Sequence, residues 1–260
     1  MVGRGSHYRD KRRRRHLERE IGEQPNLTCK DLRHWPIFCD IFKIPHMEKV
    51  FQRGECLYRS GGSGGYLIIV ESGWVAQRFE IENGSHCITD FCLPGDIFGV
   101  FQQGAAVVPH TAACLSKVSA CWISYSRLLA RAETAPELRD FLSRCAVCRE
   151  YRAYDHIANI TMRDSRGRVA HLLFELYCRT THACPERAGD EIRIPLRLAD
   201  IGEAVGLTSV HVSRTLGILR SAQVIDLQRG QMTVINPDRW RQIAGDLLVP
   251  LTDPLAGHPH

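Results

Sequence analysis

A short segment in the C-terminal third combines a tight turn with side chains that hydrogen-bond nucleobases. In residues 204–208, Gly206 is suited to end one helix in the left-handed conformation, and Thr208 is suited to cap the next. Because a guanidinium group matches O6 and N7 of guanine, Arg214 is the best candidate for reading a base pair. The candidate DNA-contacting residues are Thr208, Ser209, Val210, His211, Ser213 and Arg214.

The elements around this turn distinguish two interpretations. The segment fits an ordinary helical hairpin in which Arg214 lies on a solvated face. It also fits a helix-turn-helix, with helices at 198–205 and 208–220, and the following residues favour this second interpretation. Two strand-like segments at 224–227 and 232–235 predict the wing of a winged helix.

Upstream, residues 50–126 have the pattern of a small β-sandwich or β-roll. Short apolar segments alternate with glycine clusters such as Gly61-Gly62-Ser63-Gly64-Gly65, and turns are predicted at Asn83-Gly84 and at 94–96. Strands are expected at 57–58, 66–70, 74–79, 87–91 and 119–124.

After Pro136 the pattern becomes helical. Leu138, Phe141, Cys145 and Cys148 recur at spacings of three and four, which is a heptad-like stripe and predicts burial against the same residues of a second copy. A second helix is expected at 166–179 and a polar loop at 180–190.

The net charge of +5 is concentrated at the N-terminus. Residues 1–20 hold eight Lys and Arg, including the run at 11–15, against Asp10, Glu18 and Glu20. Such an arm is either a solvated, disordered extension or a contact for a polyanion. No apolar run is long enough to cross a bilayer, and the charged N-terminus is unlike a signal peptide, so a cytoplasmic chain without a membrane partner is expected.

Together these segments resemble the Crp/Fnr transcription regulators over residues 32–245. In the roll the resemblance rests on Gly54-Glu55, Tyr58, Gly61, Tyr66, Gly73 and the turn at 94–99. In the C-terminal part it rests on Leu198, Asp200-Ile201-Gly202 and the run Leu207-Thr208-Ser209-Val210-His211-Val212-Ser213-Arg214-Thr215-Leu216.

The resemblance implies an α+β protein with an N-terminal jelly-roll-like β-roll, a long dimerisation helix and a C-terminal winged helix-turn-helix. It implies a homodimer that binds inverted repeats in double-stranded promoter DNA, and that contacts RNA polymerase if it is an activator. The expected division is a basic arm at 1–28, a sensor roll at 29–135, a dimerisation helix at 136–160, a DNA-binding domain at 161–250 and a tail at 251–260.

Two departures from the family pattern concern specificity and signal. Val210 stands where the oxygen-sensing branch has a glutamate, so a thymine methyl replaces a cytosine amino group as the expected contact. Val100 and residues 108–111 stand where the cyclic-nucleotide binders have a glutamate and an arginine pair. Because a buried phosphodiester needs a cation or fixed donors, cyclic AMP is not expected to bind.

The eleven cysteines leave the cofactor open. The iron-sulfur branch has several N-terminal cysteines within a short window, whereas this chain has only Cys29 and Cys39 there and would need Cys114 or Cys121 as well. No cofactor is therefore predicted, with an iron-sulfur cluster and thiol oxidation at Cys145 and Cys148 as alternatives.

The competing class of protein is a β-barrel that binds a metal or small ligand, or an enzyme, with a structural helical C-terminus. His86 and His110 are too far apart to form the His-x-His pair of a cupin-type metal enzyme. No catalytic motif is found, so the sequence favours a regulator without enzymatic activity.

Overall fold

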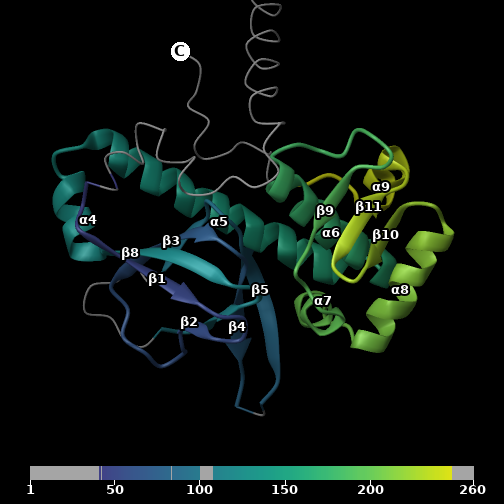
Figure 1. Cartoon of the computed structure of the whole chain (residues 1–260), viewed down its shortest axis with the longest axis horizontal. Coiled ribbons are helices and arrows are strands. Elements are labelled where there is room, and N and C mark those ends of the chain that lie inside the picture. Colours follow the sequence, from purple (N-terminus) through teal and green to yellow (C-terminus); the bar gives the residue numbers. More distant parts are fainter. Residues whose placement is uncertain (1–40, 42, 83, 100–107, 248–260) are drawn as a thin grey trace, which may run out of the picture.

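The computed structural model describes residues 41, 43–82, 84–99 and 108–247, which form a β-roll and a C-terminal helical domain (Figure 1). The long helix α5, Pro136–Met162, runs along the roll and leads into the C-terminal domain. This is the α+β architecture expected from the sequence. The basic arm at 1–28 and the tail at 251–260 lie outside the described residues.

The roll consists of two four-stranded antiparallel sheets. One sheet has the strand order β1-β8-β3-β6 and the other has the order β2-β7-β4-β5. The strands are β1 (His46–Phe51), β2 (Cys56–Tyr58), β3 (Tyr66–Ser72), β4 (Val75–Glu80), β5 (His86–Cys92), β6 (Ile97–Gly99), β7 (Thr111–Cys114) and β8 (Val118–Ser124).

Both faces of the central strands are buried. Ile68 and Trp122 belong to the cluster that fills the roll, whereas Leu67 and Ile123 belong to a cluster that also contains residues of α5 and of α4 (Tyr125–Ala132). Because side chains alternate across a strand, burial on both faces produces the continuous apolar run at 67–70.

Two glycines are required by close backbone approaches in the roll. At Gly73 (φ 83°) an added Cβ would lie 2.1 Å from the carbonyl oxygen of Lys117, and at Gly99 (φ 138°) it would lie 2.2 Å from that of Tyr66. Any other residue would push neighbouring strands apart, so these glycines fix the packing of the roll.

The strands expected from the apolar segments are present within a few residues of their expected bounds. The structure adds β1, β6, β7 and the helix α4. β1 is an edge strand with mostly exposed side chains, including Glu48 and Lys49, so it lacks a hydrophobic alternation. β7 has the sequence Thr-Ala-Ala-Cys, and its two alanines have a weak strand preference.

The apolar stripe on α5 packs within its own chain and not against a second copy, so the predicted partner of this stripe is wrong. Leu138 and Phe141 are buried within their own chain, in the cluster between the roll and α4, and Cys145 packs against the same cluster. The outward face of the helix carries Val147, Tyr151, Tyr154 and Ile157, which are 46%, 48%, 52% and 53% exposed. The more apolar stripe is the one that covers the roll, because the roll alone leaves one face of its sheet uncovered.

The C-terminal domain is a winged helix-turn-helix. It contains α6 (Ser165–Thr181), β9 (Glu191–Arg193), α7 (Leu198–Val205), α8 (Ser209–Ser221), β10 (Ile225–Gln228), β11 (Gln231–Val234) and α9 (Pro237–Ala244). Its core is continuous with Trp74, Ile88 and Phe91 of the roll. No helix in the described part of the chain has the length and apolarity needed to span a membrane.

Candidate nucleic-acid interface

The turn between α7 and α8 is held by backbone geometry and one cap. Gly206 ends α7 in the left-handed conformation (φ 68°), and the Thr208 hydroxyl accepts a hydrogen bond from His211 N at 3.2 Å. Gly202 lies under the turn, where an added Cβ would be 2.3 Å from the carbonyl oxygen of Leu207. The roles expected for Gly206 and Thr208 are confirmed, and Gly202 adds a close contact that fixes the angle between the helices.

Helix α8 has one face in the core and the other in solvent. Val212, Thr215, Leu216 and Leu219 are buried beneath it. All six candidate residues lie on the exposed side of its N-terminal part, and Val210 is 62% exposed. The structure therefore brings together Thr208, Ser209, Val210, His211, Ser213 and Arg214 on one surface.

The end of α8 is tied to the wing. Arg220 Nε lies 2.5 Å from Asp226 Oδ1, so this arginine is committed to an ion pair with β10. The wing turns at Arg229 and Gly230, both with positive φ, and places Arg229 at the tip of the hairpin. The two arginines of α8 thus differ: Arg220 pairs with the wing, and Arg214 lies on the exposed N-terminal part of the helix.

A cluster of charged side chains joins the roll to α5 and α6. Arg152 donates to Asp96 (3.1 Å) and Asp90 (3.2 Å), and Arg179 donates to Asp96 (2.6 Å) and to the Phe91 carbonyl (2.6 Å). Each of the four side chains is less than 20% exposed. We call these residues the junction cluster.

The junction cluster keeps the Asp96 carboxylate charged. Burial by itself raises the pKa of Asp96, but the guanidinium groups of Arg179 and Arg152 outweigh it, and the resulting pKa lies below the ordinary value. The carboxylates of Asp90 and Asp96 hold the pKa of Arg152 above its usual range against the effect of burial. Sequence reasoning missed this cluster because Arg152 and Asp96 are 56 residues apart and no local pattern marks the pair.

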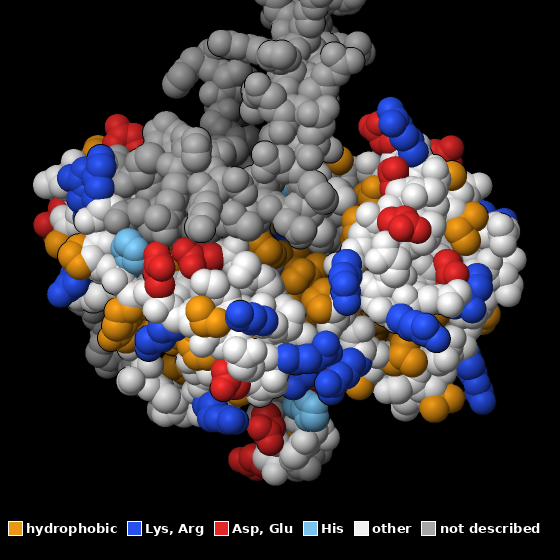
Figure 2. Space-filling model, viewed as in Figure 1, with side chains coloured by type: hydrophobic (Ala, Val, Ile, Leu, Met, Phe, Trp, Pro, Cys, Tyr) orange, Lys and Arg blue, Asp and Glu red, His pale blue; other side chains and the backbone are white. Residues whose placement is uncertain are grey.

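A second set of ion pairs joins the β4–β5 hairpin to the first helix of the helix-turn-helix. Arg78 contacts Asp200 at 2.9 Å and Glu203 at 3.2 Å, and His86 Nε2 lies 3.1 Å from Glu203. Basic side chains gather at this boundary between the two halves of the molecule (Figure 2). His86, considered above as a metal ligand, thus lies at a domain contact.

The residues at the positions where the cyclic-nucleotide binders hold the phosphate are not fixed cations. Val108 is buried, and His110 Nε2 is hydrogen-bonded to the Tyr58 hydroxyl at 2.8 Å. Burial, together with the nearby Arg149 guanidinium, lowers the pKa of His110, so this side chain is neutral at neutral pH. Val100 lies outside the described residues.

The described cysteines do not form a metal site. In the described part of the chain, no group of three or more His, Cys, Asp or Glu side chains is placed to hold a metal ion. Cys114 lies in the roll interior, whereas Cys121 belongs to the cluster beneath α4 and α5. Cys29 and Cys39 lie outside the described residues.

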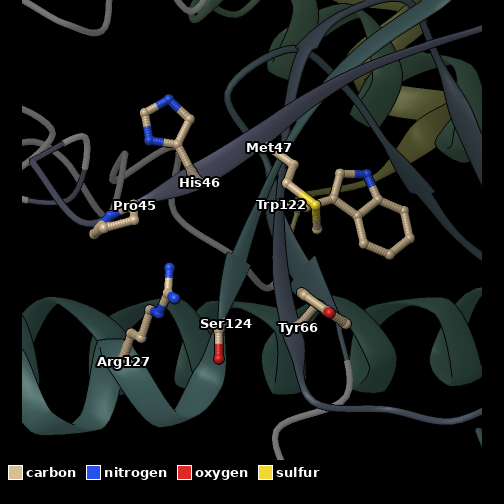
Figure 3. A pocket seen from close by; sticks show the side chains of 7 residues that line it. All are labelled: Pro45, His46, Met47, Tyr66, Trp122, Ser124 and Arg127. Atoms are coloured by element: carbon tan, nitrogen blue, oxygen red, sulfur yellow. The ribbon is translucent and has the colours of Figure 1, made fainter.

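One pocket of about 310 Å³ opens at the end of the roll beside the start of α4 (Figure 3). None of the described lining residues carries a carboxylate; Arg127 supplies a guanidinium group, and Tyr66 and Trp122 supply aromatic rings. The lining residues are Pro45, His46, Met47, Tyr66, Trp122, Ser124 and Arg127.

Comparisons with known proteins agree with this architecture. A model of the cyclic nucleotide-binding domain matches residues 48–134, and a model of the Crp-like helix-turn-helix domain matches residues 167–243. The FixK2 structure from Bradyrhizobium japonicum superposes with a TM-score of 0.69 at 24% identity, covering 78% of this chain and 99% of that one. A CRP-family regulator from Thermus thermophilus gives 0.62 at 20% identity, covering 77% and 98%.

Curated relatives extend the match to function. The fumarate and nitrate reduction regulatory protein of Escherichia coli is 27% identical over 202 residues, which is 78% of this chain and 80% of the relative. The protein of the same name from Yersinia pestis is 25% identical over 205 residues, with the same coverage. With a cyclic nucleotide-binding-like roll, a Crp-like helix-turn-helix and an exposed N-terminal face on α8, the chain belongs to the Crp/Fnr family of transcription regulators.

Proposed function

We propose that two copies of this chain bind an inverted repeat in promoter DNA, with α8 of each copy in the major groove. The observation that carries the proposal is the exposed N-terminal part of α8, whose opposite face is buried in the domain core. Arg214 hydrogen-bonds a guanine, Val210 packs on a thymine methyl, and the neighbouring hydroxyl and imidazole groups contact bases or phosphates. These neighbours are Thr208, Ser209, His211 and Ser213.

The homodimer forms through the outward face of α5. Val147, Tyr151, Tyr154 and Ile157 are each about half exposed and follow one another at spacings of three and four, which is a seam for a second helix. A two-fold protein and an inverted repeat are consequences of the same symmetry, so each half-site takes one α8.

The protein responds to a signal other than cyclic AMP. At this edge of the roll His110 is neutral and hydrogen-bonded and Val108 is buried, so neither residue offers a positive charge to a cyclic phosphate. Isothermal calorimetry with cyclic AMP is expected to show no saturable heat at micromolar concentrations. Saturable binding would contradict this part of the proposal.

Its partners are DNA, a second copy and, where it activates, RNA polymerase, and it acts in the cytoplasm without enzymatic activity. The relatives that match it are transcription regulators rather than enzymes. The basic arm, with the run at 11–15, adds phosphate contacts that do not depend on sequence.

Selection from a random duplex library tests the proposed DNA recognition. The full chain is incubated with the library at about 150 mM salt, bound duplexes are amplified, and the enriched sequences are read. An inverted repeat with a G·C pair in each half-site is the expected result. Enrichment of no sequence, in a protein that retains its fold, would contradict sequence-specific binding.

A further inference from the structure

Two cysteines meet at the end of α6. Cys178 lies in the last turn of the helix and Cys184 in the segment that follows, and their Sγ atoms are 3.8 Å apart. Cys178 is fully buried, while Cys184 is partly exposed and packs on the edge of the same core. The pair is therefore reached by small molecules from the Cys184 side only.

The chain turn that brings the thiols together is well supported. His182 adopts the left-handed conformation (φ 53°) and reverses the chain after α6. The Thr181 hydroxyl lies 2.9 Å from the carbonyl oxygens of both Tyr177 and Ala183, and bridges the helix to the segment after it. A disulfide needs the sulfurs at about 2.05 Å, so they must approach by about 1.8 Å, a distance that side-chain rotation and a small shift of the segment provide.

We propose that Cys178 and Cys184 form a dithiol site that hydroperoxides oxidise to an intramolecular disulfide. The Cys184 thiolate attacks one oxygen of hydrogen peroxide; the O–O bond breaks, hydroxide leaves, and Cys184 becomes a sulfenic acid. The Cys178 sulfur then attacks Cys184 Sγ; the S–S bond forms, the S–O bond breaks, and the Cys178 proton leaves with the oxygen as water. Overall, two thiols and one peroxide give one disulfide and two waters.

The burial of the two thiols assigns their order of reaction. Burial, with Cys184 close by, raises the pKa of Cys178 above its usual range, so this thiol is protonated and unreactive towards peroxide by itself. Its sulfur nevertheless lies 3.8 Å from Cys184 Sγ, within reach of a sulfenic acid formed there. Cys184 is thus the peroxide-reactive residue and Cys178 the resolving one.

The disulfide would form beside the contacts that hold the two halves of the protein together. Arg179, the next residue after Cys178, belongs to the junction cluster and also pairs with Glu175 at 2.8 Å. The segment that carries Cys184 leads to Asp190, which bonds the Tyr177 hydroxyl and the backbone of β11. Oxidation therefore adds a covalent link between α6 and the segment entering the wing sheet.

Tryptic mapping provides a direct test, because Arg179 lies between the two cysteines. Cleavage after Arg168, Arg179 and Arg187 separates Cys178, in peptide 169–179, from Cys184, in peptide 180–187. The purified full chain is treated with hydrogen peroxide, free thiols are blocked with iodoacetamide, and the digest is analysed by mass spectrometry without reductant. We expect the two peptides joined, with the loss of two hydrogens, and separated again by dithiothreitol.

Variants assign the roles and provide the control. Cys184→Ser should leave Cys178 open to alkylation after unfolding, and Cys178→Ser should leave a sulfenic acid on Cys184 that dimedone traps. Cys87 is exposed, so Cys87→Ser is the matched control and should retain the link. Free Cys184 after a peroxide treatment that oxidises Cys87, or a link from Cys184 to a different cysteine, would overturn the proposal.

Discussion

Arg214 is the residue on which the proposed sequence recognition depends. The sequence predicted its helix, its cap and its neighbours, and the structure places all six candidates on the exposed side of α8. Local rules sufficed here, because a glycine turn, a threonine cap and an apolar spacing of three and four determine which face of a short helix is free. The contact with DNA stays a prediction.

Replacing Arg214 with Ala tests that contact. Arg214→Ala should weaken binding to the selected site by about 1–3 kcal/mol per half-site and relax the preference at one base pair, because it removes a bidentate contact to guanine. Fluorescence anisotropy on the selected duplex and on single-base variants measures both effects.

Arg239→Ala is the control for the loss of one positive charge. Arg239 is exposed on α9, outside the proposed recognition surface. Its removal should weaken binding to all duplexes evenly, if at all. An equal loss on specific and random DNA for Arg214→Ala would show that α8 is not the recognition helix.

Asp96 is the residue whose charge stabilises the junction cluster. Asp96→Asn should lower the free energy of unfolding at pH 7 by about 2–4 kcal/mol, because Arg152 and Arg179 lose a buried carboxylate. The pKa of Asp96 is depressed in the folded state, so its contribution is present above the unfolded-state pKa of about 4 and is lost as the pH falls through the folded-state pKa. The difference in the free energy of unfolding between wild type and Asp96→Asn should therefore become smaller at acid pH.

Urea unfolding at several pH values measures the free energy of unfolding of wild type and Asp96→Asn, and Asp226→Asn is the control. Asp226 pairs with Arg220, whose side chain is 47% exposed, so solvent screens the pair and its loss should cost no more than about 1 kcal/mol. A difference in the free energy of unfolding between wild type and Asp96→Asn that stays constant from pH 7 to pH 3 would contradict the role given to the Asp96 charge.

The turn between α7 and α8 depends on Gly202, because a Cβ there would clash with the carbonyl oxygen of Leu207. Gly202→Ala should therefore lower the thermal midpoint by several degrees, whereas Gly217→Ala, in α8 with open space around its Cα, should leave it unchanged or raise it by removing a flexible residue from a helix. Circular dichroism melting compares the two. Equal midpoints for the two variants would contradict the role given to Gly202.

Helix α5 shows where sequence reasoning fails at the scale of an element. Two apolar stripes run along it, and periodicity alone does not identify the partner of each. The stripe containing Leu138 and Phe141 covers the roll, and the outward stripe stays exposed and is the proposed dimer interface. Which stripe packs on the roll depends on the apolar sheet face that α5 covers, and this face forms only when strands distant in the sequence pair.

Ile157→Glu tests the outward stripe. A carboxylate buried at a helix seam carries a large desolvation cost, so the variant should shift the protein toward monomer at micromolar concentration and weaken DNA binding. Ile81→Glu is a matched control, because Ile81 is similarly exposed (58% against 53%) but lies after β4 in the roll. Sedimentation measures the fraction of the protein that is dimeric. A dimer unaffected by Ile157→Glu would exclude this face as the interface.

At the scale of the whole molecule, the roll and the winged helix are not independent bodies. One apolar core includes residues of both, and the junction cluster and the Arg78 ion pairs join them across sequence separations of up to 122 residues. The sequence predicted each part separately, because each has its own local pattern. It carried no signal for how the parts pack, since that depends on long-range contacts between single residues such as Arg179 and Asp96.

Methylation interference on the selected duplex tests the central claim most directly, that two α8 helices read an inverted repeat through the major groove. Guanine N7 lies in that groove, so one methylated guanine in each half-site should block binding, with the two positions about one helical turn apart and related by two-fold symmetry. The Arg214→Ala variant should lose this sensitivity at those guanines. Interference confined to one side of the site, or to adenine N3 in the minor groove, would contradict the account.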